Sequence, residues 1–209
     1  MKKNVCRICR RVGQKLFLKG ERCFSPKCSL TRRPYRPGQK PKKVKAGLSD
    51  YGRELIEKQK VKCWYSLSER QFKKYAKAVL EKRGKVEDAS LELVRKLEKR
   101  LDNVVFRLGF ASSRRQARQL VSHGNFLING KPLNIPSYEV KKGEVISVKE
   151  QKKEKPFFKK ISLSLKKTKP PLWLELDKEK MSAKVVGEPT LEDANLPAEI
   201  HSVFEFYSH

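Results

Sequence analysis

The sequence predicts an α+β protein built from several small parts, and three observations support that prediction. Four cysteines stand in two close pairs near the N-terminus. Residues 49–108 carry apolar side chains at helical spacing behind recognisable N-caps. Residues 126–148 hold short apolar runs separated by an Asn-Gly and a Lys-Gly turn, which is typical of a small antiparallel sheet. At 209 residues, one or two domains are expected.

Charge is the strongest compositional signal. The chain holds 50 Lys and Arg against 23 Asp and Glu, a net charge of +27. Residues 1–50 carry 16 basic and 2 acidic side chains, residues 51–170 carry 31 and 13, and residues 171–209 carry 3 and 8. Because such self-repulsion opposes compaction, we expect a polyanionic partner. Nucleic acid is favoured over anionic lipid, since no basic helix with Trp, Phe or Leu along one face stands out.

The pattern also argues against several classes of protein. No apolar run exceeds three residues, whereas a membrane-spanning helix needs roughly 20 and a signal peptide about 7 to 15. We therefore expect a cytoplasmic protein that is neither membrane-embedded nor exported. The three histidines lack the spacing of a zinc protease, a nucleophile–base pair or a deaminase, and no Walker sequence is present. The sequence predicts no catalytic residue and no enzyme.

The cysteines predict a metal site. The first pair is spaced C-x2-C and the second C-x4-C, with thirteen residues between the pairs. Each pair would form a knuckle, and a hairpin through the alternating residues 15–19 would bring the knuckles together. Residues 1–40 have too few apolar side chains to fold unaided, which favours one structural Zn²⁺. The predicted ligands are Cys6, Cys9, Cys23 and Cys28.

Two alternatives for these cysteines stay open. They could be four unmetallated thiols in a small core, or they could hold an iron–sulfur cluster. The fifth cysteine, Cys63, is expected to be a small buried apolar residue. Beyond the cysteines, residues 29–48 are rich in Pro, Gly, Lys and Arg, so we expect either a solvated linker or an extended arm that lies along phosphates.

Three helices are expected next. Ser49 and Asp50 offer an N-cap for a helix to about Lys62. A capping box, Ser66-x-x-Glu69, would start a second helix that ends near Gly84. Asp88 would cap one continuous third helix that runs through Leu108 and stops at Gly109. In the second helix the apolar face holds Phe72, Ala76, Val79 and Leu80, whereas Arg70, Lys73, Lys74 and Lys77 lie largely elsewhere.

A compact module is expected to follow. Ser113-x-x-Gln116 is a capping box for a short helix that buries Ala117, Leu120 and Val121. That helix would display Arg114, Arg115 and Arg118 and end at Gly124. Strands are predicted over 126–128, 131–133 and 145–148, the first two joined by a type I′ turn at Asn129-Gly130. Residues 150–170 are expected to be irregular, and residues 182–209 to be mildly acidic.

These residues resemble a known family. Arg100-Leu101-Asp102-Asn103, Arg107-Leu108-Gly109-Phe110-Ala111, Ser113-Arg114, residues 117–124 and Ile128-Asn129-Gly130 closely resemble an RNA-binding module named after bacterial small-subunit ribosomal protein S-four. The four-cysteine N-terminus, residues 48–52, 57–61 and 69–72, and the ending Glu205-Phe206-Tyr207-Ser208 resemble the rest of that protein, in its zinc-containing form. The resemblance runs essentially end to end.

The resemblance implies a structural ribosomal protein with an inserted module. Such proteins bind the 5′ domain of 16S rRNA early in assembly, at a junction of several helices. They line the channel through which mRNA enters, contact ribosomal protein S-five and influence translational accuracy. The implied domains are a zinc-binding knob and basic arm (1–45), a helical rRNA-binding domain (46–98, completed by 182–209), the RNA-binding module (99–165) and a segment returning to the first domain (166–209). One departure is Asn125, where a second histidine often follows His-Gly.

RNA duplexes hide their bases in a narrow major groove, so recognition is expected through phosphates, 2′-hydroxyls and shape. Arginine forks beside a helix N-terminus suit phosphate. His123, at a helix C-terminus, could serve the helix dipole or reach a phosphate. The alternatives are an RNA-modifying enzyme carrying the same module and a zinc-dependent DNA-binding regulator. The candidate RNA-binding residues are Arg32, Arg33, Arg36, Lys40, Lys42, Lys43, Lys45, Arg53, Lys58, Lys60, Lys62, Arg70, Lys73, Lys74, Arg107, Ser112, Ser113, Arg114, Arg115, Arg118, His123 and Lys131.

Overall fold

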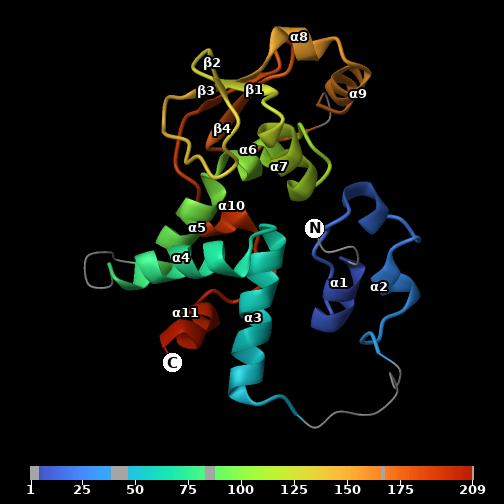
Figure 1. The fold of residues 1–209 in the computed structure, drawn as a ribbon, viewed down its shortest axis with the longest axis vertical. Coiled ribbons are helices and arrows are strands. Elements are labelled where there is room, and N and C mark those ends of the chain that lie inside the picture. The colour runs from blue at the N-terminus through green and yellow to red at the C-terminus, as the bar shows by residue number, and fades with distance from the viewer. Residues whose placement is uncertain (1–4, 39–46, 83–87, 166–167, 209) are drawn as a thin grey trace. The chain divides into compact units, whose positions relative to one another are not determined.

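The computed structural model describes residues 5–38, 47–82, 88–165 and 168–208, and it divides the chain into two compact units (Figure 1). The first unit combines Met1–Leu93 with Asn195–His209, and the second unit is Val94–Ala194. The second unit is therefore inserted into the first. We expected the module to end at residue 165 and residues 182–209 to return to the helical domain. The structure places this return later, because residues 174–185 contribute two strands to the sheet of the second unit.

The first unit is helical. Its core is formed where the C-terminal helix α11 (His201–Ser208) packs on α3 (Asp50–Trp64) and α4 (Glu69–Leu80). Figure 1 shows α11 beside α3. Phe72, Ala76 and Val79 point into this core from one helix, and Val203 and Phe204 from the C-terminal one. The helices are α1 (Cys6–Val12), η1 (Gly20–Cys23), α2 (Ser29–Arg32), α3 (Asp50–Trp64), α4 (Glu69–Leu80) and α11 (His201–Ser208).

Near the N-terminus the predicted strand over 15–19 is not formed. Leu16 and Leu18 are buried as the alternation requires, and they join Val5 and Cys9 in a small core. Phe17, between them, has a left-handed backbone with φ of 48°. That conformation interrupts an extended strand, so alternation here reflects burial without strand pairing.

The start of α4 differs from the predicted capping box. Ser66 has a left-handed backbone with φ of 56°, and the N-cap is Ser68, whose hydroxyl accepts from the Gln71 amide at 3.2 Å. Glu69 is consequently the first helical residue, and its carboxylate is free to bond elsewhere. The predicted cap of α3 is confirmed, since Ser49 accepts from the Gly52 amide. The predicted end of α4 near Gly84 lies outside the described residues.

The second unit is an antiparallel sheet with helices. Its strands are β1 (Phe126–Ile128), β2 (Lys131–Leu133), β3 (Val145–Val148), β4 (Leu174–Asp177) and β5 (Ser182–Val185), in the order β2-β1-β3-β5-β4. Phe126, Ile146 and Ala183 are buried from one face, where side chains of α6 (Leu101–Arg107) and α7 (Arg114–Ser122) complete the core. The other helices of this unit are α8 (Glu150–Lys153), α9 (Pro156–Leu165) and α10 (Leu191–Ala194), whereas α5 (Ala89–Glu98) begins in the first unit and ends in the second.

The hairpin is confirmed. Ile128 pairs with Lys131 around Asn129 and Gly130, whose φ values of 48° and 78° suit a type I′ turn. The predicted caps are also confirmed at Asp88, which accepts from the Ser90 amide at 2.7 Å, and at Ser113, which accepts from the Gln116 amide at 3.3 Å. Residues 150–170 were expected to be irregular, but α8 and α9 form there, and Phe158 and Leu165 of α9 are buried in the core.

The predicted third helix is broken in two. At Arg100 the backbone is extended, with φ of −64° and ψ of 134°, and it forms a β-bridge with Glu139. The Leu101 amide donates to the Tyr138 carbonyl at 2.8 Å, and the Val140 amide donates to the Lys99 carbonyl at 2.9 Å. These long-range bonds replace the helical ones, so α5 ends and α6 begins. Periodicity cannot reveal such a break, because apolar residues keep helical spacing on both sides of it.

A polar network fills that break. The Arg100 guanidinium, 1% exposed, binds Asp102 through two hydrogen bonds of 3.0 and 2.7 Å. Burial raises the pKa of Asp102, although Arg100 and Arg118 oppose this shift. Removing one partner of a buried ion pair leaves the other charged and desolvated, which lowers the free energy of unfolding by about 3–5 kcal/mol.

Asp102→Ala should therefore destabilise the protein by about 3–5 kcal/mol in urea unfolding, because Arg100 would stay buried without its carboxylate. Glu175→Ala is the matched control: Glu175 is exposed on β4, and its removal should change the free energy of unfolding by less than about 0.5 kcal/mol. Equal stability of the two variants would contradict a structural role for the Arg100–Asp102 pair.

Candidate metal centre and nucleic-acid interface

The four N-terminal cysteines line one small cavity of about 20 Å³. Cys6 and Cys9 lie three residues apart on α1, so both face the same side of that helix. Cys23 ends η1, and Cys28 is the N-cap of α2. The first pair was expected in a knuckle and is instead held by a helical turn, although all four cysteines line the same cavity. None of the five cysteines is in a disulfide.

The neighbouring thiols affect the pKa of Cys9. Burial raises the pKa of Cys9, and the nearby Cys23, Cys6 and Cys28 raise it further. Burial also opposes ionisation of Cys28, but hydrogen bonds from Thr31 and Leu30 outweigh it and lower the pKa of Cys28. Four sulfur donors around a cavity of this size suit tetrahedral Zn²⁺. Within the described ranges, however, no group of three or more His, Cys, Asp or Glu side chains is arranged to hold a metal ion, so zinc binding stays a prediction.

The basic arm begins on the cysteine-rich segment. Arg10 on α1 donates from Nε to the carbonyls of Arg33 at 3.1 Å and Tyr35 at 3.0 Å, and its guanidinium lies 4.9 Å from the centre of the Tyr35 ring. Arg10 therefore fixes residues 33–35 beside α1, while Arg32 and Arg33 stay exposed. Four predicted RNA-binding residues of the arm lie outside the described residues: Lys40, Lys42, Lys43 and Lys45.

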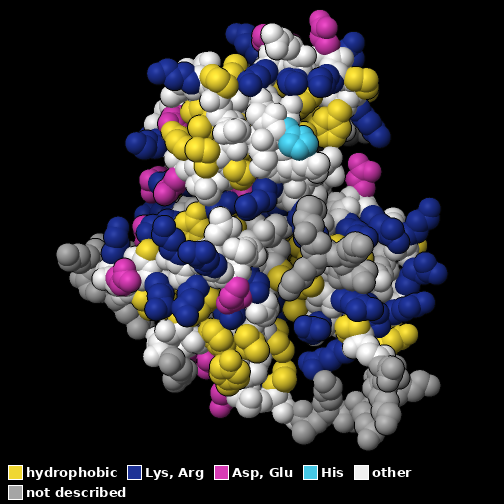
Figure 2. Space-filling view, viewed as in Figure 1, with side chains coloured by type: hydrophobic (Ala, Val, Ile, Leu, Met, Phe, Trp, Pro, Cys, Tyr) yellow, Lys and Arg dark blue, Asp and Glu magenta, His cyan; other side chains and the backbone are white. Residues whose placement is uncertain are grey.

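The clearest basic surface lies on α4. Arg70, Lys73, Lys74 and Lys77 are all exposed, and their spacing of three and four residues places them on one face. The opposite face is buried. Figure 2 shows Lys and Arg side chains gathered over α4 and over α1 and α2, with few acidic side chains among them. A row of cations on a rigid helix suits the phosphates of a nucleic acid.

Lys58 and Lys62 were expected to join this surface, but both bind the carboxylate of Glu69 instead. The Glu69 carboxylate accepts from Lys58 at 2.7 Å and from Lys62 at 2.6 Å. Lys58 is buried and its Nζ lies 4.0 Å from the centre of the Phe206 ring. Burial would raise the pKa of Glu69, but these two hydrogen bonds lower it to about 2. Tyr207 also donates to Glu69, at 3.2 Å, so the group fixes α11 against α3 and α4.

In the second unit two predicted RNA-binding arginines are also structural. Arg107 binds the buried Glu98 through two hydrogen bonds of 2.9 and 2.8 Å. Arg114 is buried, donates to Asn103 at 2.7 Å and lies over the Phe106 ring at 4.5 Å. The expectation that α7 displays Arg114 is therefore wrong. The sequence pattern missed this because helical spacing alone cannot tell a guanidinium that faces a buried amide from one that faces solvent.

The other side chains of α7 remain available. Arg115 is half-buried, and Arg118 keeps 39% of its side chain exposed while lying 3.7 Å from Asp102. Ser112 is exposed, whereas Ser113 is buried as the N-cap, and His123 is exposed at the C-cap. Lys131 is exposed on the hairpin. In the first unit, Arg36 and Lys60 are half-buried, Lys60 pairs with Glu57, and the exposed Arg53 lies 3.7 Å from Asp50.

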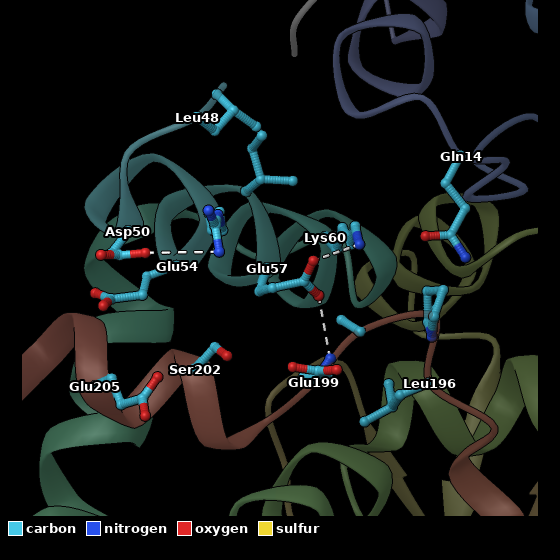
Figure 3. A pocket seen from close by; sticks show the side chains of 14 residues that line it. Gln14, Leu48, Asp50, Glu54, Glu57, Lys60, Leu196, Glu199, Ser202 and Glu205 are labelled. Atoms are coloured by element: carbon cyan, nitrogen blue, oxygen red, sulfur yellow. Dashed lines mark hydrogen bonds and ion pairs between the residues drawn. The ribbon is translucent and has the colours of Figure 1, made fainter. Parts of the chain in front are cut away.

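An acidic groove of about 1000 Å³ in the first unit was not expected (Figure 3). Its walls come from α3, from residues 196–199 and from α11. Asp50, Glu54 and Glu57 face it from α3, at a spacing of four and three residues that could have revealed a shared face. The lining includes five carboxylates and two cations, namely Asp50, Glu54, Glu57, Glu199 and Glu205 with Arg53 and Lys60. RNA would be repelled here.

No helix within the described ranges is long and apolar enough to cross a membrane.

Two family models together match residues 1–146. One, described as the ribosomal protein S4/S9 N-terminal domain, matches residues 1–98, and the other, described as the S4 domain, matches residues 99–146. Curated relatives named small ribosomal subunit protein uS4 are similar over nearly the whole chain. The relative from Caldicellulosiruptor saccharolyticus is 51% identical over 203 residues, 97% of this chain and 96% of the relative. Those from Acetivibrio thermocellus and Halothermothrix orenii are 48% and 47% identical, covering 97% and 98% of this chain and 96% of each relative.

Proposed function

The chain belongs to the uS4 family of ribosomal proteins, and from this premise we propose that it is a structural protein of the small ribosomal subunit that binds 16S rRNA. The observation that carries the proposal is the exposed row of cations on α4, opposite a fully apolar face. Such a surface neutralises phosphates, releases counterions and needs no reacting group. The family is structural, which favours a role without catalysis over an RNA-modifying enzyme.

We assign the finer contacts to two rigid surfaces. The α4 row would meet one stretch of RNA backbone. Arg115 and Arg118 of α7, with the exposed Ser112, would meet another, since planar guanidinium groups bind phosphate with two hydrogen bonds. Contacts from two units suit a junction of several helices in the 5′ domain, bound early in assembly. The basic arm would lie along RNA or along mRNA in the channel through which mRNA enters the subunit.

We also propose that the N-terminal cysteines bind one structural Zn²⁺. Cys6, Cys9, Cys23 and Cys28 would be its ligands, and the hydrogen bonds at Cys28 favour the thiolate that a ligand must be. The buried side chains of residues 5–18 form only a small core. A metal would supply the stabilisation that this core lacks.

The acidic groove supports a protein contact. Two of its carboxylates are balanced internally, because Asp50 lies near Arg53 and Glu57 pairs with Lys60. Glu54 has a buried Oε2 with no hydrogen-bond partner within the described part of the chain. A cationic side chain of a neighbouring subunit protein would satisfy it. We assign this groove to ribosomal protein S-five, the neighbour implied by the family resemblance, through which an effect on translational accuracy would act.

Replacing Arg70 and Lys74 together by alanine should weaken binding to a 16S rRNA 5′-domain fragment. It should also reduce the slope of log K against log salt by about two, since each lost phosphate contact removes about one. Lys180→Ala with Lys184→Ala removes the same charge from exposed sites elsewhere and should leave the slope unchanged. A slope that does not respond to the α4 variant would remove this helix from the interface. Preference for duplex DNA over the fragment would favour a DNA-binding regulator.

Cys9→Ser should lower the zinc content of the purified protein and expose roughly the first 40 residues to limited proteolysis. Cys63→Ser is the matched control, because Cys63 packs against the same small core but does not line the cavity. It should retain one zinc per chain. Wild-type protein that contains no metal, or a Cys9 variant that resists protease as the wild type does, would refute the zinc site.

Glu54→Gln with Glu205→Gln should weaken binding to purified ribosomal protein S-five on the order of tenfold, because a buried cation would lose its partner. The affinity for 16S rRNA should not fall. Glu175→Gln with Glu179→Gln, both exposed in the second unit, serves as the control. An unchanged affinity for S-five would show that the groove is not its docking site.

A further inference from the structure

Phe24 presents an open aromatic face. It keeps 75% of its surface exposed, and its ring stacks on Phe17 with a centroid distance of 4.8 Å and an interplanar angle of 26°. Phe17 in turn meets Trp64 edge-on at 6.3 Å. One face of the Phe24 ring therefore packs on Phe17, which contacts Trp64 at the end of α3, while the other face is open. The ring of Phe24 is therefore not part of the hydrophobic core.

The segment that carries Phe24 is held firmly. Phe24 lies in the short loop between Cys23 and Cys28, and its amide donates to the Glu21 carbonyl at 3.1 Å. The Ser25 hydroxyl donates to the Arg22 carbonyl at 3.1 Å and accepts from the Lys27 amide at 3.3 Å. A ring fixed in this way loses little conformational freedom when a flat ligand stacks on it.

The surroundings of Phe24 are strongly basic. Lys19, Arg22 and Lys27 are exposed close to it in the sequence. Residues 5–38 contain ten basic side chains and one acidic side chain, Glu21. An apolar protein partner would leave these cations without opposite charges, whereas the phosphates of a nucleic acid would neutralise them. Aromatic side chains among cations are the usual platform for unpaired bases, because every base has a stacking face.

We propose that Phe24, backed by Phe17, is a stacking site for an unpaired RNA base. This site differs in kind from the α4 row, which meets phosphates. It rests on the proposed rRNA binding only for the identity of the RNA. Bases inside duplex RNA are stacked on their neighbours and offer no such face, so the site selects an unpaired nucleotide in a bulge, a loop or a single strand.

The test uses the full-length protein and two RNAs with no ribosomal sequence, a single-stranded adenylate 12-mer and a 12-base-pair RNA duplex. Phe24→Leu should weaken binding to the 12-mer about tenfold, since stacking on an aromatic ring is lost. Its affinity for the duplex should not change. The salt slope for the 12-mer should also stay the same, because no phosphate contact is removed.

Three controls separate stacking from damage to the fold. Phe24→Tyr keeps a stacking face and should bind the 12-mer as the wild type does. Tyr51→Leu removes another exposed aromatic ring in the same unit, on α3 next to Asp50, and should leave the affinity for both RNAs unchanged. Thermal unfolding of Phe24→Leu should match the wild type, since the ring is exposed.

Equal binding of Phe24→Leu and wild type to the 12-mer would overturn the proposal, as would an equal loss on both RNAs. The proposed function fails by a different result, namely a wild-type protein that does not prefer the 16S rRNA fragment to other RNA of the same length.

Discussion

The second unit depends on two buried carboxylates that must be neutralised where α5 gives way to α6. Glu98 is 0% exposed and Asp102 is 4% exposed. Arg107 and Asn103 satisfy the first, and Arg100 satisfies the second. Because an unpaired charge at such depth is costly, separating these partners destabilises the unit. The network also joins distant parts of the chain, since Arg107 donates to the carbonyl of Ala194 and Asn103 accepts from Arg114.

The basic side chains of this protein consequently serve two purposes. Some form ion pairs within the protein: Lys58 and Lys62 with Glu69, Arg100 with Asp102, and Arg107 with Glu98. Other basic side chains are exposed, and those on α4 are held on a helix whose other face is buried. The internal pairs fix the helices, and the helices fix the external cations. Rigid cations lose less entropy on meeting phosphates, so the internal pairs would contribute to the proposed RNA binding without touching RNA.

The surface sites proposed for RNA and for a protein partner also differ in charge. The α4 row is positive, and the groove between α3 and α11 is negative, although both belong to the first unit. The excess of carboxylates around the groove disfavours contact with RNA phosphates there. Opposite charges on separate surfaces therefore let a strongly basic protein bind rRNA and a protein neighbour without competition between them. The aromatic ring of Phe24 would add recognition of unpaired bases, which charge alone cannot provide.

Local chemistry in the sequence determined the caps at Ser49, Asp88 and Ser113, the Asn129-Gly130 hairpin and the α+β class, because each depends on residues close together in the chain. Spacing also predicted a shared site for the four cysteines, which line one cavity, while their binding of zinc stays a prediction. Tertiary structure alone decided the break at Arg100, the strands β4 and β5 and the burial of Lys58 and Arg114. For these three residues the deciding contact lies on another segment of the chain: Glu139 for Arg100, Phe206 for Lys58 and Asn103 for Arg114. A helical pattern gives the direction of a side chain but not the element it will meet.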